Sequence, residues 1–334
     1  MRRNLFIPLL FIFLIAGNLI CEKSWAGTVE VSSEGLQRLV IKGLDANISV
    51  TSLPQAKTVR ISGVEDVLTP GLYIVERKGS TLEVHINEWA TKSDWKEQLG
   101  IKRNRASLDI SGFGLATEVY LKEGQVQLSK MSKGARVVLG RGKVNSTDSS
   151  GALEIFVHQG ETLVQNQAGR TKIDQYQGNI NLLNLQADLD LVAFNSNINI
   201  EKSRGIMSLN TQNSPTKVVQ SRGTLQLDNG KGAIMVQQFQ GRVDGSTQEG
   251  ALSISLLADS EIHLRSQSGK VQIQLPPASG AALNLIANVG EILVPEGLKI
   301  NRGVSEKSFR GKLAGDSQKA SVTVRSQEGV IVIK

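Results

Sequence analysis

The sequence predicts an all-β protein, a β-solenoid or β-helix-like repeat fold with strand-turn units of about nine residues. Three observations support this fold class: a nine-residue glycine period, apolar residues that alternate with polar ones after each glycine, and an aromatic content of only 4%. Alternation with a period of two is typical of strands with one buried face, and a fixed longer period is typical of repeat architectures. Few aromatic residues favour a narrow core of valine, isoleucine and leucine.

Glycine recurs at every ninth position from Gly142 to Gly250. Ten of these thirteen positions are glycine and the other three are alanine or serine, although glycine makes up only about a tenth of the chain. Apolar residues follow two or four positions later in most units, as at Val144 and Ile155. Glycine permits the positive φ and close backbone approach that a sharp corner requires. We expect two units per turn of the solenoid, but the period also allows three.

The sequence predicts no catalytic, cofactor or metal site. The three histidines, His85, His158 and His263, lie in separate strand regions, and none has a partner at the spacing of a zinc site. Calcium-binding nonapeptide repeats share the nine-residue period, but they need a recurring aspartate that these units lack. No Gly-x-Ser-x-Gly motif is present.

A polysaccharide-degrading β-helix enzyme is the catalytic alternative. Such an enzyme needs carboxylates gathered on one face of neighbouring turns. Asp188 and Asp190 are predicted to lie on the outer face of one strand, with Asp174 or Lys172 on a neighbouring strand. Charges on a solvated sheet explain these residues more simply, because exposed carboxylates are common on protein surfaces. The sequence therefore favours a protein that is not an enzyme.

Residues 1–26 are predicted to be a signal peptide. A positively charged start precedes an apolar run at residues 5–20, and small residues then place cleavage between Ala26 and Gly27. The run is shorter than the roughly 20 residues of a membrane span, so we expect none after signal removal; a retained anchor is the alternative. The only cysteine, Cys21, would leave with the signal peptide, and the bulky Ile20 before it argues against lipidation.

Three regions follow the predicted signal peptide. Residues 27–112 form an N-terminal β region, residues 113–275 carry the solenoid repeats, and residues 276–334 form a C-terminal β region that closes the solenoid. The N-terminal region contains an insert at residues 87–105 without strand alternation. A capping box and a terminal glycine predict a short helix at residues 91–100 of this insert.

The insert is also the candidate contact surface. Its aromatic and basic residues are Trp89, Trp95, Lys102, Arg103 and Arg105. Aromatic side chains beside cations often mark interfaces. A helix that only caps the open end of the core is the alternative, and the sequence favours it because terminal repeats must cover their apolar surface.

The charge of the chain is mildly basic. Removal of residues 1–26 takes away Arg2, Arg3, Lys23 and Glu22, which leaves 35 basic and 30 acidic side chains, a net charge of +5. This charge is spread along the chain and falls short of a nucleic-acid-binding profile. It favours contact with anionic surfaces. We therefore expect a cell-envelope polymer, a glycan or a surface protein as the partner, and a monomer if both ends are capped.

Several segments resemble a bacterial putative-adhesin family that is classed as a domain of unknown function. These segments are residues 43–63, the Gly-x-Val/Ile-x-Ile/Leu units, Ser268–Val271 leading into Leu275–Pro276, the turn between Gly311 and Gly315, and the closing Ser326–Ile333. The resemblance covers nearly the whole mature chain. It implies a β-helix-like fold and an adhesive or envelope role without a known active site. The tryptophan-containing insert is less typical of this family.

The sequence thus predicts an exported, non-catalytic binding protein, an adhesin or another module that contacts the cell envelope. We expect it in the periplasm, or secreted to the cell surface. A periplasmic scaffold or an envelope-stress component is the alternative function, and a polysaccharide-degrading enzyme ranks behind both.

Overall fold

The computed structural model describes residues 21–22, 28–64, 73–86, 106–112, 114–276, 279–296, 301–302, 306–313 and 317–334. The predicted helix and contact surface at residues 87–105 lie outside these ranges, as does the predicted cleavage site. All regular secondary structure in the described ranges is β-strand, and they contain no helix that could cross a membrane.

Twenty-five strands are linked in one sheet. Their bounds are β1 Cys21–Glu22, β2 Thr28–Ser32, β3 Arg38–Ser52, β4 Thr58–Val64, β5 Tyr73–Lys78, β6 Thr81–Ile86, β7 Ala106–Gly112, β8 Ala116–Ser129, β9 Ala135–Thr147, β10 Leu153–Gln165, β11 Thr171–Leu183, β12 Leu189–Phe194, β13 Ser196–Glu201, β14 Arg204–Gln212, β15 Thr216–Val219, β16 Arg222–Asn229, β17 Ile234–Thr247, β18 Leu252–Ser266, β19 Val271–Gln274, β20 Ser279–Ala287, β21 Ile292–Leu293, β22 Asn301–Arg302, β23 Lys307–Leu313, β24 Ser317–Ser326 and β25 Ile331–Ile333.

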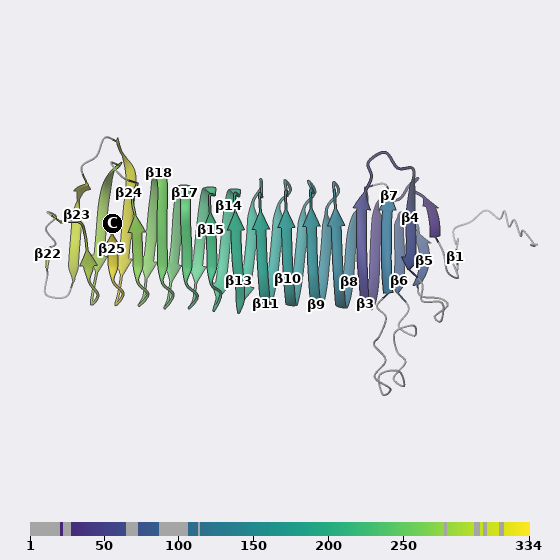
Figure 1. Ribbon diagram of the computed structural model, residues 1–334, viewed down its shortest axis with the longest axis horizontal. Helices are drawn as coiled ribbons and strands as arrows, with labels where there is room; N and C mark the ends of the chain where they lie inside the picture. Colours follow the sequence, from purple (N-terminus) through teal and green to yellow (C-terminus); the bar gives the residue numbers. More distant parts are fainter. Residues whose placement is uncertain are drawn as a thin grey trace, which may run out of the picture.

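The strands in the middle of the chain stack in parallel, and their register partners are two of the predicted units apart in the sequence. Leu153 of β10 lies opposite Ala135 of β9 on one side and Thr171 of β11 on the other. The same offset joins the strands from β8 to β17. Each layer of the stack therefore holds two nine-residue units. Figure 1 shows these layers side by side along the long axis.

Each layer adds one strand segment to each of two sheet faces. Face A contains the first halves of β8 to β11, then β12, β14, β16, the second halves of β17 and β18, and β24. Face B contains the other halves of the long strands together with β13, β15, β19 and β25. The two faces enclose a narrow apolar core.

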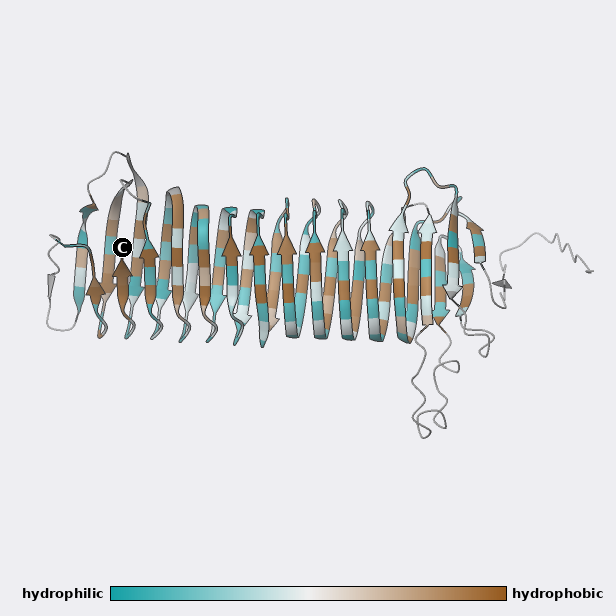
Figure 2. Ribbon diagram, in the orientation of Figure 1, coloured by the Kyte–Doolittle hydropathy of each residue, from teal (hydrophilic) through white to brown (hydrophobic). Residues whose placement is uncertain are grey.

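Core residues stack on their register partners from layer to layer. Ile155, Ile173 and Leu191 are successive partners on face A, and each is 0% exposed. Their sequence neighbours point outward, so the predicted alternation of buried and exposed residues is confirmed. Figure 2 shows the resulting bands of hydrophobic and hydrophilic residues across the strands.

The repeated glycines lie in two columns, one at each edge of the stack. The positive-φ glycines inside strands at the first edge are Gly124, Gly142, Gly160 and Gly178, and those at the second edge are Gly205, Gly223 and Gly241. From β8 to β11 the chain bends within one strand at the first edge and turns at the second, whereas β17 and β18 run continuously through the second edge. The expected short strand and turn in every unit is found from β12 to β16 but not from β8 to β11, where a glycine bend lets β9, for example, continue for 13 residues.

Both ends of the stack depart from the repeat. At the N-terminal end, β4 pairs antiparallel with β7, β2 with β4, and β5 with β6. Near the C-terminal end, β24 lies between β18 and β20, and β25 lies between β19 and β21. The last strands of the chain are thus inserted inside the stack, and the C-terminus lies there in Figure 1.

Candidate binding surface on face A

Aromatic side chains gather on the outside of face A over β9 to β12. They line a hollow of about 370 Å³, which we call the aromatic hollow. Its lining includes Val138, Phe156, His158, Tyr176, Val192 and Phe194. Tyr176 is 50% exposed and Phe194 is 41% exposed. Large rings that remain this exposed on a folded chain mark a candidate binding surface.

Three of these rings form a ladder along the stack. The ring centroids of His158 and Tyr176 lie 5.1 Å apart with an angle of 7° between the planes, and those of Tyr176 and Phe194 lie 5.8 Å apart at 29°. Successive rings are two units apart in the sequence, so the parallel register places one ring in each layer. The distances match a strand spacing of about 4.8 Å with small tilts of the rings. The ladder therefore follows directly from the two-unit offset.

Charged side chains border the aromatic hollow. The Arg136 guanidinium lies 5.1 Å from the Phe156 ring centroid, and the Lys172 ammonium lies 5.6 Å from it. Lys172 Nζ also lies 3.8 Å from Asp174 Oδ2. Burial raises the pKa of Asp174 above its ordinary value, and Lys172 opposes this shift. Arg136 also lies 3.9 Å from Glu154, so two cations and two carboxylates border a largely apolar lining.

A second, more polar hollow of about 820 Å³ continues face A over β14, β16, β17, β18 and β24. We call it the polar hollow, and its lining includes Asn210, Asp228, Ser246, His263, Arg265 and Arg325. The two hollows meet at the β12–β14 pair, where Val192 is the register partner of Asn210. Together they extend across nine strands, or about 40 Å at the usual strand spacing.

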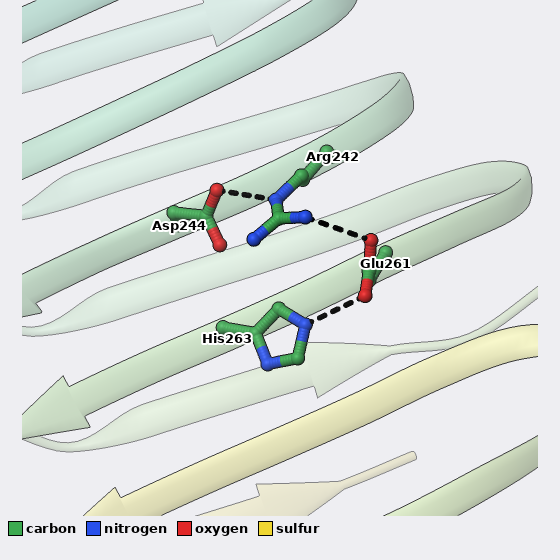
Figure 3. A network of polar contacts seen from close by, with 4 residues as sticks. All are labelled: Arg242, Asp244, Glu261 and His263. Atoms are coloured by element: carbon green, nitrogen blue, oxygen red, sulfur yellow. Dashed lines mark hydrogen bonds and ion pairs between the residues drawn. The ribbon is translucent and has the colours of Figure 1, made fainter.

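Four residues at the polar hollow form a connected polar network of one arginine, two carboxylates and one histidine (Figure 3). Arg242 Nε donates to Asp244 Oδ2 at 2.5 Å, and Arg242 Nη1 donates to Glu261 Oε2 at 3.3 Å. His263 Nε2 lies 2.8 Å from Glu261 Oε1. The hydrogen bond with His263, and then the charge of Arg242, hold the pKa of Glu261 below its usual value. Asp244 and Glu261 are therefore already paired within this network.

The N-terminal layers carry another charged cluster. Single ligand atoms of Glu76, Glu83 and His85 lie within 4.8 Å of one another, a grouping that a metal ion can use. Lys78 Nζ, however, lies 3.2 Å from Glu76 Oε2 and 2.8 Å from Glu83 Oε2. Hydrogen bonds from Lys78 and then His85 lower the pKa of Glu83 to about 2. The lysine supplies the positive charge, so the cluster is explained as an ion-pair network.

The acidic residues of the enzymatic alternative have separate roles. Asp190 is the register partner of Lys172 on the neighbouring strand, and Asp174 lies beside Lys172, as predicted. Asp188 instead accepts a hydrogen bond from the Ile206 backbone N–H at 3.0 Å. Of the three histidines, predicted in separate strand regions, His158 and His263 lie on strands of face A, and His85 lies on β6, which joins face A through β3.

Sequence reasoning missed the aromatic ladder. His158, Tyr176 and Phe194 recur at twice the nine-residue glycine period, so a search for aromatic residues at that doubled spacing would have found them. Their common face was not visible at nine-residue spacing, because alternate units lie on opposite faces.

Comparison with known proteins shows only distant similarity. No family model and no curated protein matches the chain. Similar solved structures include a putative cell adhesion protein from Clostridium sporogenes, at 11% identity and a TM-score of 0.20, covering 92% of this chain and 97% of that one. A putative adhesin from Bacteroides fragilis has 12% identity and a TM-score of 0.26, covering 94% and 98%. A putative lipid binding protein from Parabacteroides distasonis has 9% identity and a TM-score of 0.33, covering 92% and 96%. The resemblance to the putative-adhesin family therefore stays a prediction.

Proposed function

We propose that this protein is an exported, non-catalytic binding protein of the cell envelope, an adhesin or related module. Its parallel stack is a β-solenoid with two nine-residue units per turn, and face A binds a polysaccharide chain along the long axis. A long rod with repeated outer positions suits such a ligand, because many weak contacts along one polymer add through multivalency.

The observation that carries this proposal is the aromatic ladder within a continuous surface. The rings of Tyr176 and Phe194 stack face on face and expose their edges, which form a ridge of apolar contact area with little side-chain freedom left to lose on binding. The neighbouring polar hollow supplies amide, hydroxyl and charged groups that can bond to sugar hydroxyls. A combination of apolar contact area and a few orienting polar groups is typical of ligand sites.

Binding without catalysis is favoured by the openness of the surface. A raised carboxyl pKa near a second carboxylate, as at Asp174 and Asp190, is also a feature of glycoside-cleaving sites. Such sites, however, close around the substrate and exclude water. The turns between β9 and β14 are short, and the hollow lies on the outside of a sheet. Release of reducing ends from a bound polysaccharide that is abolished by Asp174→Asn would instead support the enzymatic alternative.

Polysaccharide affinity tests the role of the ladder. The Tyr176→Ala/Phe194→Ala double variant should bind an envelope polysaccharide preparation roughly tenfold more weakly, since each ring contact contributes about 0.5–1.5 kcal/mol. Met235→Ala is the matched control, because Met235 is 44% exposed but lies on face B. Equal binding by all three proteins in a titration would remove the ladder from the proposal.

Protease treatment of intact cells tests the location. Digestion of the tagged protein on intact cells agrees with a surface adhesin. Protection that ends only after permeabilisation would contradict surface display and favour the periplasmic scaffold.

A further inference from the structure

We infer that the polysaccharide is acidic, and that Arg265 and Arg325 in the polar hollow bind its anionic groups. This inference rests on the proposed function and names the class of its ligand. It is carried by a pair of arginines whose charges no other described residue balances.

Arg265 and Arg325 lie side by side on neighbouring parallel strands. They are direct register partners on β18 and β24, both line the polar hollow, and both are exposed. Strand spacing places their backbones about 4.8 Å apart. Like charges on directly opposite residues destabilise a sheet. A bound anion would remove this repulsion, whereas water and salt only screen it.

The carboxylates at the polar hollow have other hydrogen-bond partners. Asp244 and Glu261 bind Arg242 and His263 in the network of Figure 3. Asp228 accepts a hydrogen bond from Ser246 and lies two strands away from Arg265. In the described part of the chain, neither Arg265 nor Arg325 has an ion-pair partner. Their guanidinium groups are therefore available to a ligand.

The chemistry of arginine suits the anionic groups of glycans. A guanidinium donates two parallel N–H bonds to one carboxylate or sulfate, which adds orientation to charge attraction. Two adjacent guanidinium groups can hold one such group between them or two groups on successive sugars. The aromatic hollow, which is continuous with this site, would hold the sugar rings of the same chain.

Single-stranded nucleic acid is the competing polyanion, because aromatic rings and arginines also bind it. It carries a phosphate at every residue and needs a positively charged path along its length. Face A instead presents Glu154, Asp174, Asp190 and Asp228, interspersed with Arg136 and Lys172, so the positive charge is not continuous along the track. These carboxylates would repel a uniformly charged backbone, while a glycan with acid groups at intervals can avoid them.

The chain offers a matched control for the arginine pair. Arg204 and Arg222 are also register partners on neighbouring strands, and both are exposed. They lie at the start of β14 and β16 and do not line the polar hollow. Replacing this pair removes the same charge from the same kind of site without touching the surface in question.

The test measures affinity for charged and neutral forms of the same polymers. The probes are hyaluronan, which carries a carboxylate on every second sugar, with its carboxyl-reduced neutral form, lightly sulfated dextran with dextran, and a single-stranded DNA of similar length. The intact protein should bind at least one charged polymer about tenfold more tightly than its neutral form, with an affinity that falls as salt rises. Arg265→Gln/Arg325→Gln should abolish this preference and retain binding of the neutral form, while Arg204→Gln/Arg222→Gln should behave like the unmodified protein.

Each contrary outcome has a separate meaning. Equal binding of charged and neutral forms would overturn the inference and leave the proposed function standing. The same conclusion follows if both arginine-pair variants lose the preference equally, since bulk charge would then explain it. Tighter binding of the DNA than of any glycan would identify nucleic acid as the ligand. Absence of binding to every polysaccharide would overturn the proposed function and the inference together.

Discussion

Gly142 occupies a position where the stack leaves no room for a side chain. Its φ is +142°, and a Cβ there would lie 1.8 Å from the carbonyl oxygen of Gly124 in the preceding layer. Gly142→Ala should lower the free energy of unfolding by at least about 2 kcal/mol, since backbone strain adds to the overlap. Urea unfolding followed by circular dichroism measures this loss.

Gly79 supplies the control for Gly142. Its φ is +62°, but a Cβ there would meet nothing within 4 Å. Gly79→Ala should therefore lower the free energy of unfolding by only about 1 kcal/mol, the cost of holding alanine in the left-handed conformation. Equal losses in the two variants would show that backbone conformation, rather than contact between layers, requires the glycine.

Glu83 should make the free energy of unfolding depend on pH in the acidic range. Its pKa falls from 4.5 to about 2 in the folded chain, chiefly through the hydrogen bond from Lys78. A carboxylate with a lowered folded-state pKa stabilises the fold above its unfolded pKa, and this contribution is lost as pH falls through the folded pKa. Glu83→Gln should therefore be less stable than the unmodified protein above pH 4.5, and the difference should shrink as pH falls toward 2.

Unfolding free energies across this pH range test the prediction for Glu83. Glu161→Gln is the control, because Glu161 forms an ion pair with Lys143 in which both side chains are about half exposed. Exposed pairs of this kind contribute little. A difference between Glu83→Gln and the unmodified protein that stays constant with pH would contradict the assignment.

At the scale of single elements, the turns are held by buried polar side chains as well as by glycine. Asn229 is 1% exposed at the end of β16 and accepts a hydrogen bond from Thr211 Oγ1 at 2.9 Å. Its Nδ2 donates to Gly232 O at 2.6 Å and lies 3.1 Å from Thr247 Oγ1. The side chain thus ties three successive layers together at one edge.

Asn229→Ala should destabilise the protein by about 1–3 kcal/mol, because it leaves buried donors and acceptors without partners. Asn197 provides the comparison, since it makes a similar layer-to-layer bond to Asn179 at 3.1 Å but is exposed. Asn197→Ala should change stability by no more than about 0.5 kcal/mol. Thermal unfolding of the two variants shows whether a hydrogen bond between layers stabilises the protein only where the asparagine is buried.

At the scale of the whole molecule, we expect that one complete layer of two nine-residue units can be deleted without loss of the fold. Deleting residues 153–170 joins Ala152 to Thr171, which already occupies the equivalent position one layer later. Because each layer contacts mainly its neighbours, the shortened protein should fold cooperatively with a modest loss of stability. Its circular dichroism spectrum and thermal transition measure this.

Deleting only residues 153–161 should be far more damaging. The nine-residue deletion preserves the glycine period but moves Tyr176 into the position of Gln167, which is 1% exposed. An aromatic ring would then be forced into a tightly filled turn, and overpacking is destabilising. Loss of the folded spectrum is expected, and equal tolerance of both deletions would show that the two edges are interchangeable.

The sequence carried more information about the fold than about the binding surface. Buried and exposed residues such as Ile155 and Glu154 alternate over short distances, so their pattern was readable directly. The candidate surface at residues 87–105 was chosen for its composition, and it lies outside the described residues. The aromatic ladder could have been found only by assuming two units per layer, which the period alone leaves open.

The sequence by itself determined the nine-residue period, the alternation of core and surface residues, and the all-β class. These properties depend on neighbours within a few residues along the chain. Only the tertiary structure decided which glycine column bends a continuous strand, and that β24 and β25 enter the stack beside β18 and β19. It also decided that Arg265 meets Arg325. Such pairings join segments far apart in the sequence, and their register depends on the packing of whole strands, which no local pattern specifies.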